Sequence, residues 1–291
     1  MSITVAQAVL LGILQGLTEF LPVSSTAHLA LAQSLIPGFS QPGILFDVLL
    51  HVGTLVAVVA FFRSRIGETA AGLVSADAGG RRAAWRLVGL LALAVALTGA
   101  IALPLKRLAL ETMTDVRTIG FSLCGTCVLL VAAQAVGQRR GTGGRALAEV
   151  RPRDAALVGV CQAASAVFHG LSRSGNTISV GLFTGMSRKA AAEFSFLLSI
   201  PTILAAAAVE NLSAWRHHPE SLASGAWPVY LVGMATAALV GYAAIAALLH
   251  LIVSMKLVPF ILYTGLLGLF LVVFGQRLGS GFVGDVANLV R

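Results

Sequence analysis

The stretch EFLPVSSTAHLAL, residues 19–31, decides how this chain folds. It lies early in a sequence of 291 residues that is 57% hydrophobic and 11% charged, with a mean hydropathy of +0.89. This composition is typical of a polytopic α-helical membrane protein, since several apolar windows reach the roughly 20 residues that a bilayer-spanning helix needs. A carboxylate, a proline, three hydroxyls and a histidine interrupt such a window here. The interruption predicts a chain that turns back inside the membrane, because broken backbone at that depth survives only where protein or water covers it.

Two regions carry an interruption of this kind. Residues 3–36 and 154–187 are apolar but are cut near their middle by glycine, proline or histidine and a cluster of hydroxyls, so we expect two re-entrant helical hairpins. Six uninterrupted windows are expected to span the bilayer: 43–62, 83–103, 117–137, 189–209, 228–253 and 257–276. The predicted fold is all-α, with about ten helices in one integral-membrane domain, residues 1–291. The first twenty residues lack the basic region of a cleavable signal, so we expect them to be retained.

Positive charge is concentrated in the loops on one side of the predicted spans. Loops 63–86 and 139–153, together with Arg188, Lys189 and Lys256, carry most of the basic residues. The opposite side holds the smaller set, Lys106, Arg107, Arg117, Arg216, Arg277 and Arg291. The positive-inside rule therefore places the more basic loops in the cytoplasm, with the first hairpin on the outer side and the second on the inner side. The same bias explains the net charge of +8, and we do not expect nucleic acid as a partner.

The two halves of the sequence resemble each other weakly. At an offset of 147, LLGILQGLTEFLPVSS aligns with LVGVCQAASAVFHGLS, which matches Gly12 to Gly159, Gln15 to Gln162, and Ser25 to Ser172. At an offset of 148, FDVLLHVGTLVA (46–57) aligns with FSFLLSIPTILA (194–205). Together with the odd number of spans between the hairpins, these matches indicate inverted-topology repeats, residues 1–138 and 152–280. In such folds the broken segments meet near the midplane and form the site.

Both interruptions supply side chains that suit an anion. The first hairpin offers Gln15, Glu19, Ser24, Ser25, Thr26 and His28, and the second offers Ser172, Arg173, Ser174, Gly175, Asn176 and Thr177. Small and hydroxyl residues at a helix start leave free backbone N–H groups and a positive dipole end, and a guanidinium matches phosphate oxygens. An ionised side chain in the bilayer costs on the order of 3 kcal/mol, which makes Glu19 and Arg173 functional candidates. Asp47 and His51 share a helix face and fit either a supporting role or an interhelical hydrogen bond.

Several of these residues have alternative roles. Glu19 and Arg173 could simply neutralise each other. Three of the hydroxyl residues are as well suited to be N-caps as ligands: Ser24, Thr26 and Ser174. Ser25, three residues before His28, could act as a nucleophile while His28 or Glu19 moves the proton, or Glu19 could activate a water instead. Glu19 could also hold a divalent cation that bridges two phosphates.

At these residues the sequence resembles a known family. QGLTEFLPVSSTAH (15–28) and FHGLSRSGNTISVGLFTGMSRKAAAEFSFLLSIPT (168–202) are similar to the two signature regions of the bacterial undecaprenyl pyrophosphate phosphatase family, of the bacitracin-resistance type. The similarity runs from about residue 4 to residue 275. The family motif E/Q-x-x-x-E falls on Gln15 and Glu19, P-V-S-S-T-x-H falls on Pro22 to His28, and P-G-x-S-R-S-G-x-T falls on His169 to Thr177. His169 replaces the usual proline, and Gln15 replaces the glutamate of many members, which leaves Glu19 as the main carboxylate.

The resemblance implies six spans and two re-entrant helix pairs in inverted repeats. It implies removal of the terminal phosphate of undecaprenyl diphosphate, which regenerates the lipid carrier for peptidoglycan synthesis, in a multi-pass protein of the bacterial inner membrane. The site would open to the periplasm and need a divalent cation, Mg²⁺ or Ca²⁺, near Glu19. The main alternative is a polyprenyl-phosphate carrier that uses the same anion site, and a structural scaffold is a third reading. The sequence leaves the oligomeric state open, with a homodimer as one expectation.

Overall fold

The computed structural model describes residues 3–36, 45–141, 143–217 and 227–290. The first half contains α1 (Val5–Phe20), α2 (Ser25–Leu35), α3 (Leu45–Phe61), α4 (Arg63–Leu73), α5 (Ala78–Ala102), α6 (Lys106–Thr114) and α7 (Val116–Arg140). The second half contains the 3₁₀ turn η1 (Leu147–Glu149), α8 (Pro152–Val167), α9 (Arg173–Thr184), α10 (Arg188–His217), α12 (Trp227–Val253) and α13 (Val258–Val290). The prediction of an all-α fold is confirmed.

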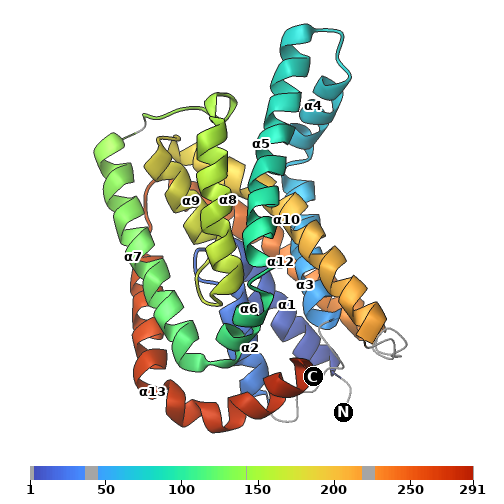
Figure 1. Ribbon diagram of the computed structural model, residues 1–291, viewed down its shortest axis with the longest axis vertical. Helices are drawn as coiled ribbons and strands as arrows, with labels where there is room; N and C mark the ends of the chain where they lie inside the picture. The colour runs from blue at the N-terminus through green and yellow to red at the C-terminus, as the bar shows by residue number, and fades with distance from the viewer. Residues whose placement is uncertain (1–2, 37–44, 142, 218–226, 291) are drawn as a thin grey trace.

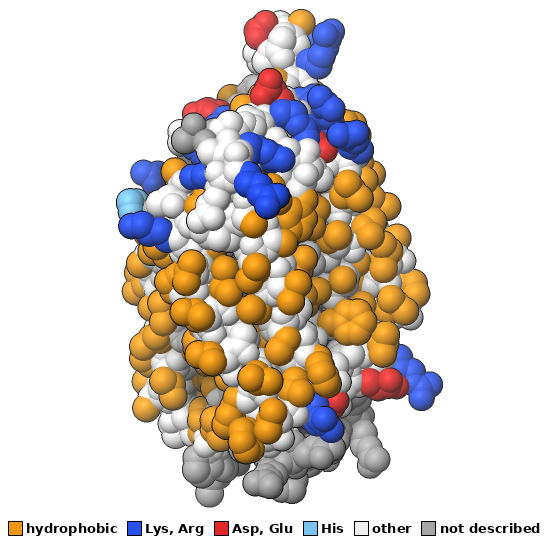
Figure 2. Space-filling model, turned by 90° about the vertical axis from the view of Figure 1, so that its left-hand side faces the viewer, with side chains coloured by type: hydrophobic (Ala, Val, Ile, Leu, Met, Phe, Trp, Pro, Cys, Tyr) orange, Lys and Arg blue, Asp and Glu red, His pale blue; other side chains and the backbone are white. Residues whose placement is uncertain are grey.

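Long apolar helices form the body of the molecule. Five in the described ranges are long and apolar enough to cross a bilayer, and they are α5, α7, the Arg188–Val209 part of α10, α12, and the Val258–Gly275 part of α13. The remaining predicted span, 43–62, corresponds to α3. This helix is long and apolar enough to cross a bilayer only when it is taken together with α4, and the two helices are bent by 73° relative to each other. Figure 2 shows hydrophobic side chains in a band around the middle of the visible face and Lys and Arg gathered at one end. The protein is therefore a multi-pass membrane protein.

Each interrupted region forms a pair of helices joined by a short turn, as predicted. In Figure 1 the α1–α2 pair lies in the lower half of the molecule and the α8–α9 pair in the upper half. The second turn contains Gly170 at φ 110°, where an added Cβ would come within 2.5 Å of the carbonyl oxygen of Ile119 on α7. A residue with a side chain is excluded there by both its backbone conformation and the space. The turn therefore packs directly against α7.

Helix packing repeats between the two halves. In order, α1, α2, α3, α5 and α7 correspond to α8, α9, α10, α12 and α13, while α4 and α6 have no counterpart. Under this exchange α1 packs on α12 as α8 packs on α5, and α2 touches α13 as α9 touches α7. The α3–α10 and α7–α13 contacts map onto themselves. This pattern is that of inverted-topology repeats. The repeat limits 1–138 and 152–280 stay a prediction.

Two glycines that align in the sequence occupy matching places in this packing. A Cβ on Gly12 of α1 would lie 2.6 Å from the carbonyl oxygen of Gly233 on α12. A Cβ on Gly159 of α8 would lie 2.5 Å from the carbonyl oxygen of Ala94 on α5. Small residues let helix backbones approach closely, which is a main source of packing between helices in lipid. These contacts hold the first helix of each hairpin, and hence its tip, in place.

The largest core cluster draws on both halves. The largest cluster of buried apolar residues includes Phe20 and Leu90 from the first half and Phe194 and Phe196 from the second. Phe20, the last residue of α1, packs edge-on against Phe196 of α10 with ring centroids 5.8 Å apart. Phe20, which follows Glu19 in the sequence, thus packs against the second half.

Candidate active site

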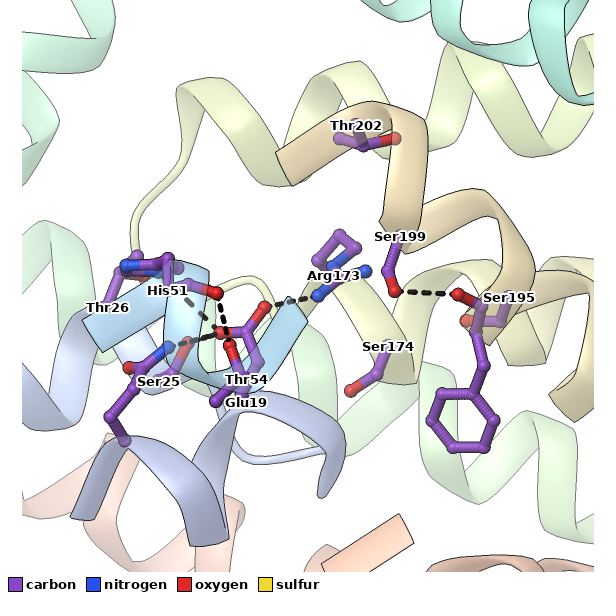
Figure 3. Close-up of polar contacts among 12 residues, drawn as sticks. Glu19, Ser25, Thr26, His51, Thr54, Arg173, Ser174, Ser195, Ser199 and Thr202 are labelled. Carbon is purple, nitrogen blue, oxygen red and sulfur yellow. Dashed lines mark hydrogen bonds and ion pairs between the residues drawn. The ribbon is translucent and has the colours of Figure 1, made fainter. Parts of the chain in front are cut away.

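The tips of the two hairpins meet at Glu19. This buried carboxylate lies in the last turn of α1. Arg173, the first residue of α9, donates from Nη2 to Glu19 Oε1, and Ser25, the first residue of α2, donates from Oγ to Oε2 at 2.5 Å. Gln15, one turn earlier on α1, donates from Nε2 to Oε2 at 3.0 Å. Figure 3 shows Ser25 and Arg173 turned toward Glu19 from opposite sides. The structure brings together the carboxylate, hydroxyl and guanidinium singled out from the sequence.

The two tips also touch each other directly. The Ser174 hydroxyl donates to the carbonyl oxygen of Leu21 at 3.2 Å. A Cβ on Gly175 would lie 3.0 Å from the Cβ of Pro22, so the absence of a side chain allows the close approach. The backbone N–H of Gly175 donates to the hydroxyl of Ser172 at 3.2 Å. Gly175 therefore allows the two tips to pack closely. Its backbone N–H is already hydrogen-bonded to Ser172, the N-cap of the same helix.

Both second helices of the hairpins begin beside the carboxylate. Ser24 is the N-cap of α2, with φ 69°, and Ser172 is the N-cap of α9. By position in the helix, Ser24 corresponds to Ser172 and Ser25 to Arg173. The sequence alignment at an offset of 147 instead pairs Ser25 with Ser172, so the two correspondences differ by one residue. The positive dipole ends of both helices thus lie next to Glu19. They stabilise the ionised carboxylate, and they suit an anionic ligand.

His51 on α3 also belongs to this site, although the sequence left its role open. Its Nε2 lies 3.6 Å from Glu19 Oε2, and its Nδ1 lies 2.8 Å from the carbonyl oxygen of Asp47 (Figure 3). Because a carbonyl only accepts, Nδ1 carries a hydrogen and Nε2 is the atom turned to the carboxylate. Thr54 donates its hydroxyl to the His51 carbonyl oxygen at 2.8 Å. The available signal was the spacing of Asp47, His51 and Thr54 along one face of an otherwise apolar helix.

His28 is held away from the other predicted catalytic residues. Its Nδ1 lies 2.7 Å from the carbonyl oxygen of Ser24, and its Nε2 lies 2.6 Å from the phenol oxygen of Tyr263 on α13. Among the hydrogen bonds of the described residues, none joins His28 to Ser25 or Glu19. The group placed to accept the Ser25 proton is therefore Glu19. Sequence reasoning missed Tyr263, which carries no local signal.

The remaining hydroxyl and amide residues make contacts within the hairpins. The Thr26 hydroxyl lies 3.3 Å from that of Ser24. Asn176 donates from Nδ2 to two groups of α8 at 2.5 and 2.9 Å. The Thr177 hydroxyl lies 2.6 Å from that of Ser195 on α10. Asn176 and Thr177 are thus turned toward neighbouring helices, and their contact with a substrate stays a prediction.

The two departures from the family motif lie in different surroundings. Gln15 uses its Nε2 on Glu19, while its buried Oε1 has no hydrogen-bond partner among the described residues. His169 lies in the turn before α9, where its Nδ1 is 3.3 Å from the hydroxyl of Thr112 on α6. His169 therefore fastens the second turn to α6, and only Gln15 departs within the hydrogen-bond network of Glu19.

Two inverted repeats whose broken helices bring a carboxylate, a hydroxyl and a guanidinium together define a multi-pass membrane protein with a buried polar site, whose guanidinium and helix N-termini suit an anion. The family model of the bacitracin resistance protein BacA matches residues 8–270, and the chain belongs to this family. It is 41% identical over 261 residues to an undecaprenyl-diphosphatase of Syntrophotalea carbinolica, covering 90% of this chain and 95% of the relative. It is 39% identical over 282 residues to an undecaprenyl-diphosphatase of Treponema denticola, covering 93% and 97%.

Proposed function

We propose that this protein hydrolyses undecaprenyl diphosphate to undecaprenyl phosphate and inorganic phosphate, which recycles the lipid carrier of peptidoglycan synthesis. The observation that carries the proposal is the convergence of Ser25 and Arg173, from opposite hairpins, on Glu19. The activity in the names of the relatives supplies the substrate. The isoprenoid tail would lie among the apolar helices and the diphosphate at the hairpin tips. Nothing in the described residues or the comparisons favours the carrier alternative.

Ser25 supplies the nucleophile in this reaction, and Glu19 takes its proton across their 2.5 Å hydrogen bond. The Ser25 oxygen attacks the terminal phosphorus, and the bond from that phosphorus to the bridging oxygen breaks. Undecaprenyl phosphate leaves with the bridging oxygen, which accepts the proton held by Glu19. Arg173 and the two helix N-termini stabilise the charge on the transferred group. Water then hydrolyses the phosphoserine, which releases phosphate and returns a proton to Ser25.

Release of inorganic phosphate from undecaprenyl diphosphate by the purified protein in detergent tests this function. Arg173→Ala is expected to lower kcat/KM by about 10²- to 10³-fold, because it removes a donor to the transferred phosphoryl group. Arg107→Ala is the matched control, since its side chain is 94% exposed on α6. No phosphate release by the folded wild-type protein, or full activity of Arg173→Ala, contradicts the proposal.

The covalent route has its own test. After acid quenching during turnover, the wild-type protein should carry phosphate on Ser25, and Ser25→Ala should lose nearly all activity. Near wild-type turnover by Ser25→Ala would rule out the phosphoserine. Glu19 would then activate a water directly, with Arg173 in the same role.

A divalent cation, Mg²⁺ or Ca²⁺, is part of the proposal. The Glu19 carboxylate and the unpartnered Gln15 Oε1 are oxygen ligands of the kind that these ions prefer. No group of three or more His, Cys, Asp or Glu residues that could hold a metal occurs in the described ranges, so phosphate oxygens of the substrate would complete the coordination. The ion would neutralise charge on the two phosphates. A chelator should abolish phosphate release, and Gln15→Ala should raise the cation concentration needed to restore it.

The proposed setting is the bacterial inner membrane, with the site open to the periplasmic side. The concentration of Lys and Arg at one end of the molecule supports this orientation. A homodimer also stays a prediction, for which the molecular mass in detergent is the measurement.

A further inference from the structure

Both ring nitrogens of His28 have a partner, and this determines its tautomer. Nδ1 lies 2.7 Å from the Ser24 carbonyl oxygen, which can only accept, so Nδ1 carries the hydrogen. In the neutral ring Nε2 then has a lone pair and no hydrogen. The phenol oxygen of Tyr263 at 2.6 Å must therefore be the donor in this second hydrogen bond.

Tyr263 reaches His28 from the second repeat, 235 residues further along the chain. Its ring stacks on the imidazole with centroids 5.5 Å apart and an angle of 19° between the planes. The tyrosine is 45% exposed on the surface of α13, whereas His28 is only 8% exposed. The stacking and the hydrogen bond together fix both the position and the rotation of the imidazole. One turn before His28 on the same helix is Ser25, the proposed nucleophile.

We propose that Tyr263 is a positioning residue that fixes the His28 ring and, through it, the first turn of α2, so that the Ser25 hydroxyl stays on Glu19. This inference rests on the proposed function. His28 bonds back to the carbonyl oxygen of Ser24, the N-cap of α2, so the link runs from α13 through the imidazole to the residue before Ser25. Glu19 remains the group that takes the Ser25 proton.

The test is Tyr263→Phe, which keeps the ring that stacks on His28 and removes only the hydroxyl. Because one orienting hydrogen bond is lost, kcat should fall by about 3- to 10-fold with KM nearly unchanged. Tyr242→Phe is the matched control, since Tyr242 is 42% exposed on α12 and packs its ring on Phe61. That variant should keep the wild-type kcat. Thermal unfolding of both variants confirms that the fold is intact.

Nitrogen NMR of protein labelled with ¹⁵N-histidine gives a readout that does not depend on turnover, and the signal of His28 is assigned by its loss in His28→Gln. The wild-type protein should show one protonated and one unprotonated nitrogen for His28. Tyr263→Phe should move the unprotonated resonance toward that of a free imidazole nitrogen, and Tyr242→Phe should not. A hydrogen on Nε2 in the wild type, or unchanged resonances and kcat in Tyr263→Phe, would overturn the proposal. A wild-type protein with the expected NMR signals but no phosphate release contradicts the proposed function instead.

Discussion

Glu19 illustrates what a buried carboxylate in a membrane protein requires. Burying an ionised side chain in the membrane costs free energy unless other groups neutralise or hydrogen-bond it. Arg173, Ser25 and Gln15 all donate hydrogen bonds to the two oxygens of Glu19. The ion pair with Arg173 was the structural alternative to a catalytic role, and the pair is present. Charge neutralisation alone does not account for the 2.5 Å hydrogen bond from Ser25. The contact with Ser25 is what the proposed chemistry needs.

Glu19→Gln tests this residue directly. The amide keeps the shape of the side chain but cannot take the Ser25 proton or pair with the Arg173 charge. Because a positioned general base contributes about 10²- to 10⁴-fold, kcat for phosphate release should fall within that range. Glu68→Gln changes a side chain that is 63% exposed on α4 and should leave kcat unchanged. Wild-type turnover by Glu19→Gln would show that another group takes the proton.

At the scale of the helix, the position of the site depends on where α1 is held. Gln15 and Gly12 lie on the same helix as Glu19, one and two turns before it, and Gly12 touches the backbone of α12. A change that pushes α1 away from α12 therefore moves the carboxylate as well. Because the tip contacts of Ser25 and Arg173 are short, a small displacement is enough to break them.

Gly12→Ala is expected to destabilise the protein and to lower its activity. The added Cβ would lie 2.6 Å from the carbonyl oxygen of Gly233, so the helices must separate, at a cost of about 1–3 kcal/mol. Gly89→Ala is the control, because a Cβ on Gly89 of α5 meets nothing within 4 Å. Thermal unfolding in detergent should show a lower midpoint for Gly12→Ala only. Equal midpoints for the two variants would mean that α1 does not rely on this close approach.

The hairpins themselves could be predicted because their signal is local. A cluster of proline or glycine with hydroxyl residues inside an apolar segment favours a break in the helix, so the turns around Pro22 and Gly170 could be predicted from the sequence. The self-similarity of the two halves then predicted that Glu19, Ser25 and Arg173 would meet. The bend of 73° between α3 and α4 was not predicted, because no proline or glycine marks it.

The contacts that sequence reasoning missed lie between distant helices. Tyr263 reaches His28 only because α13 packs beside α2, and nothing near residue 263 indicates which face of the helix will meet that hairpin. His51 was noticed for its helix face, but its approach to Glu19 depends on how α3 lies against α1. The offset of 147 holds for α1 and α8, but the turn between α8 and α9 is one residue longer than the turn between α1 and α2. The starts of α2 and α9 therefore correspond at an offset of 148.

For the molecule as a whole, the inverted repeat divides the site between the two halves. The first half provides the carboxylate and the nucleophile, and the second provides the guanidinium, so neither half contains the complete site. The halves differ outside this shared core. In Figure 1, α4 and its turn to α5 extend from the upper end of the molecule, while α6 lies in the lower half. Figure 2 shows Lys and Arg gathered at that upper end.

This asymmetry predicts how the protein is oriented. In the positive-inside arrangement the α4–α5 turn faces the cytoplasm and α6 faces the periplasm. In a variant whose three cysteines are replaced by alanine, Glu111→Cys on α6 should react with a membrane-impermeant thiol reagent in intact spheroplasts, because position 111 is exposed. Ala76→Cys, exposed in the α4–α5 turn, should react only after the membrane is permeabilised. The reverse pattern would place the first hairpin on the cytoplasmic side, so a diphosphate bound at its tip would be drawn from the inner leaflet.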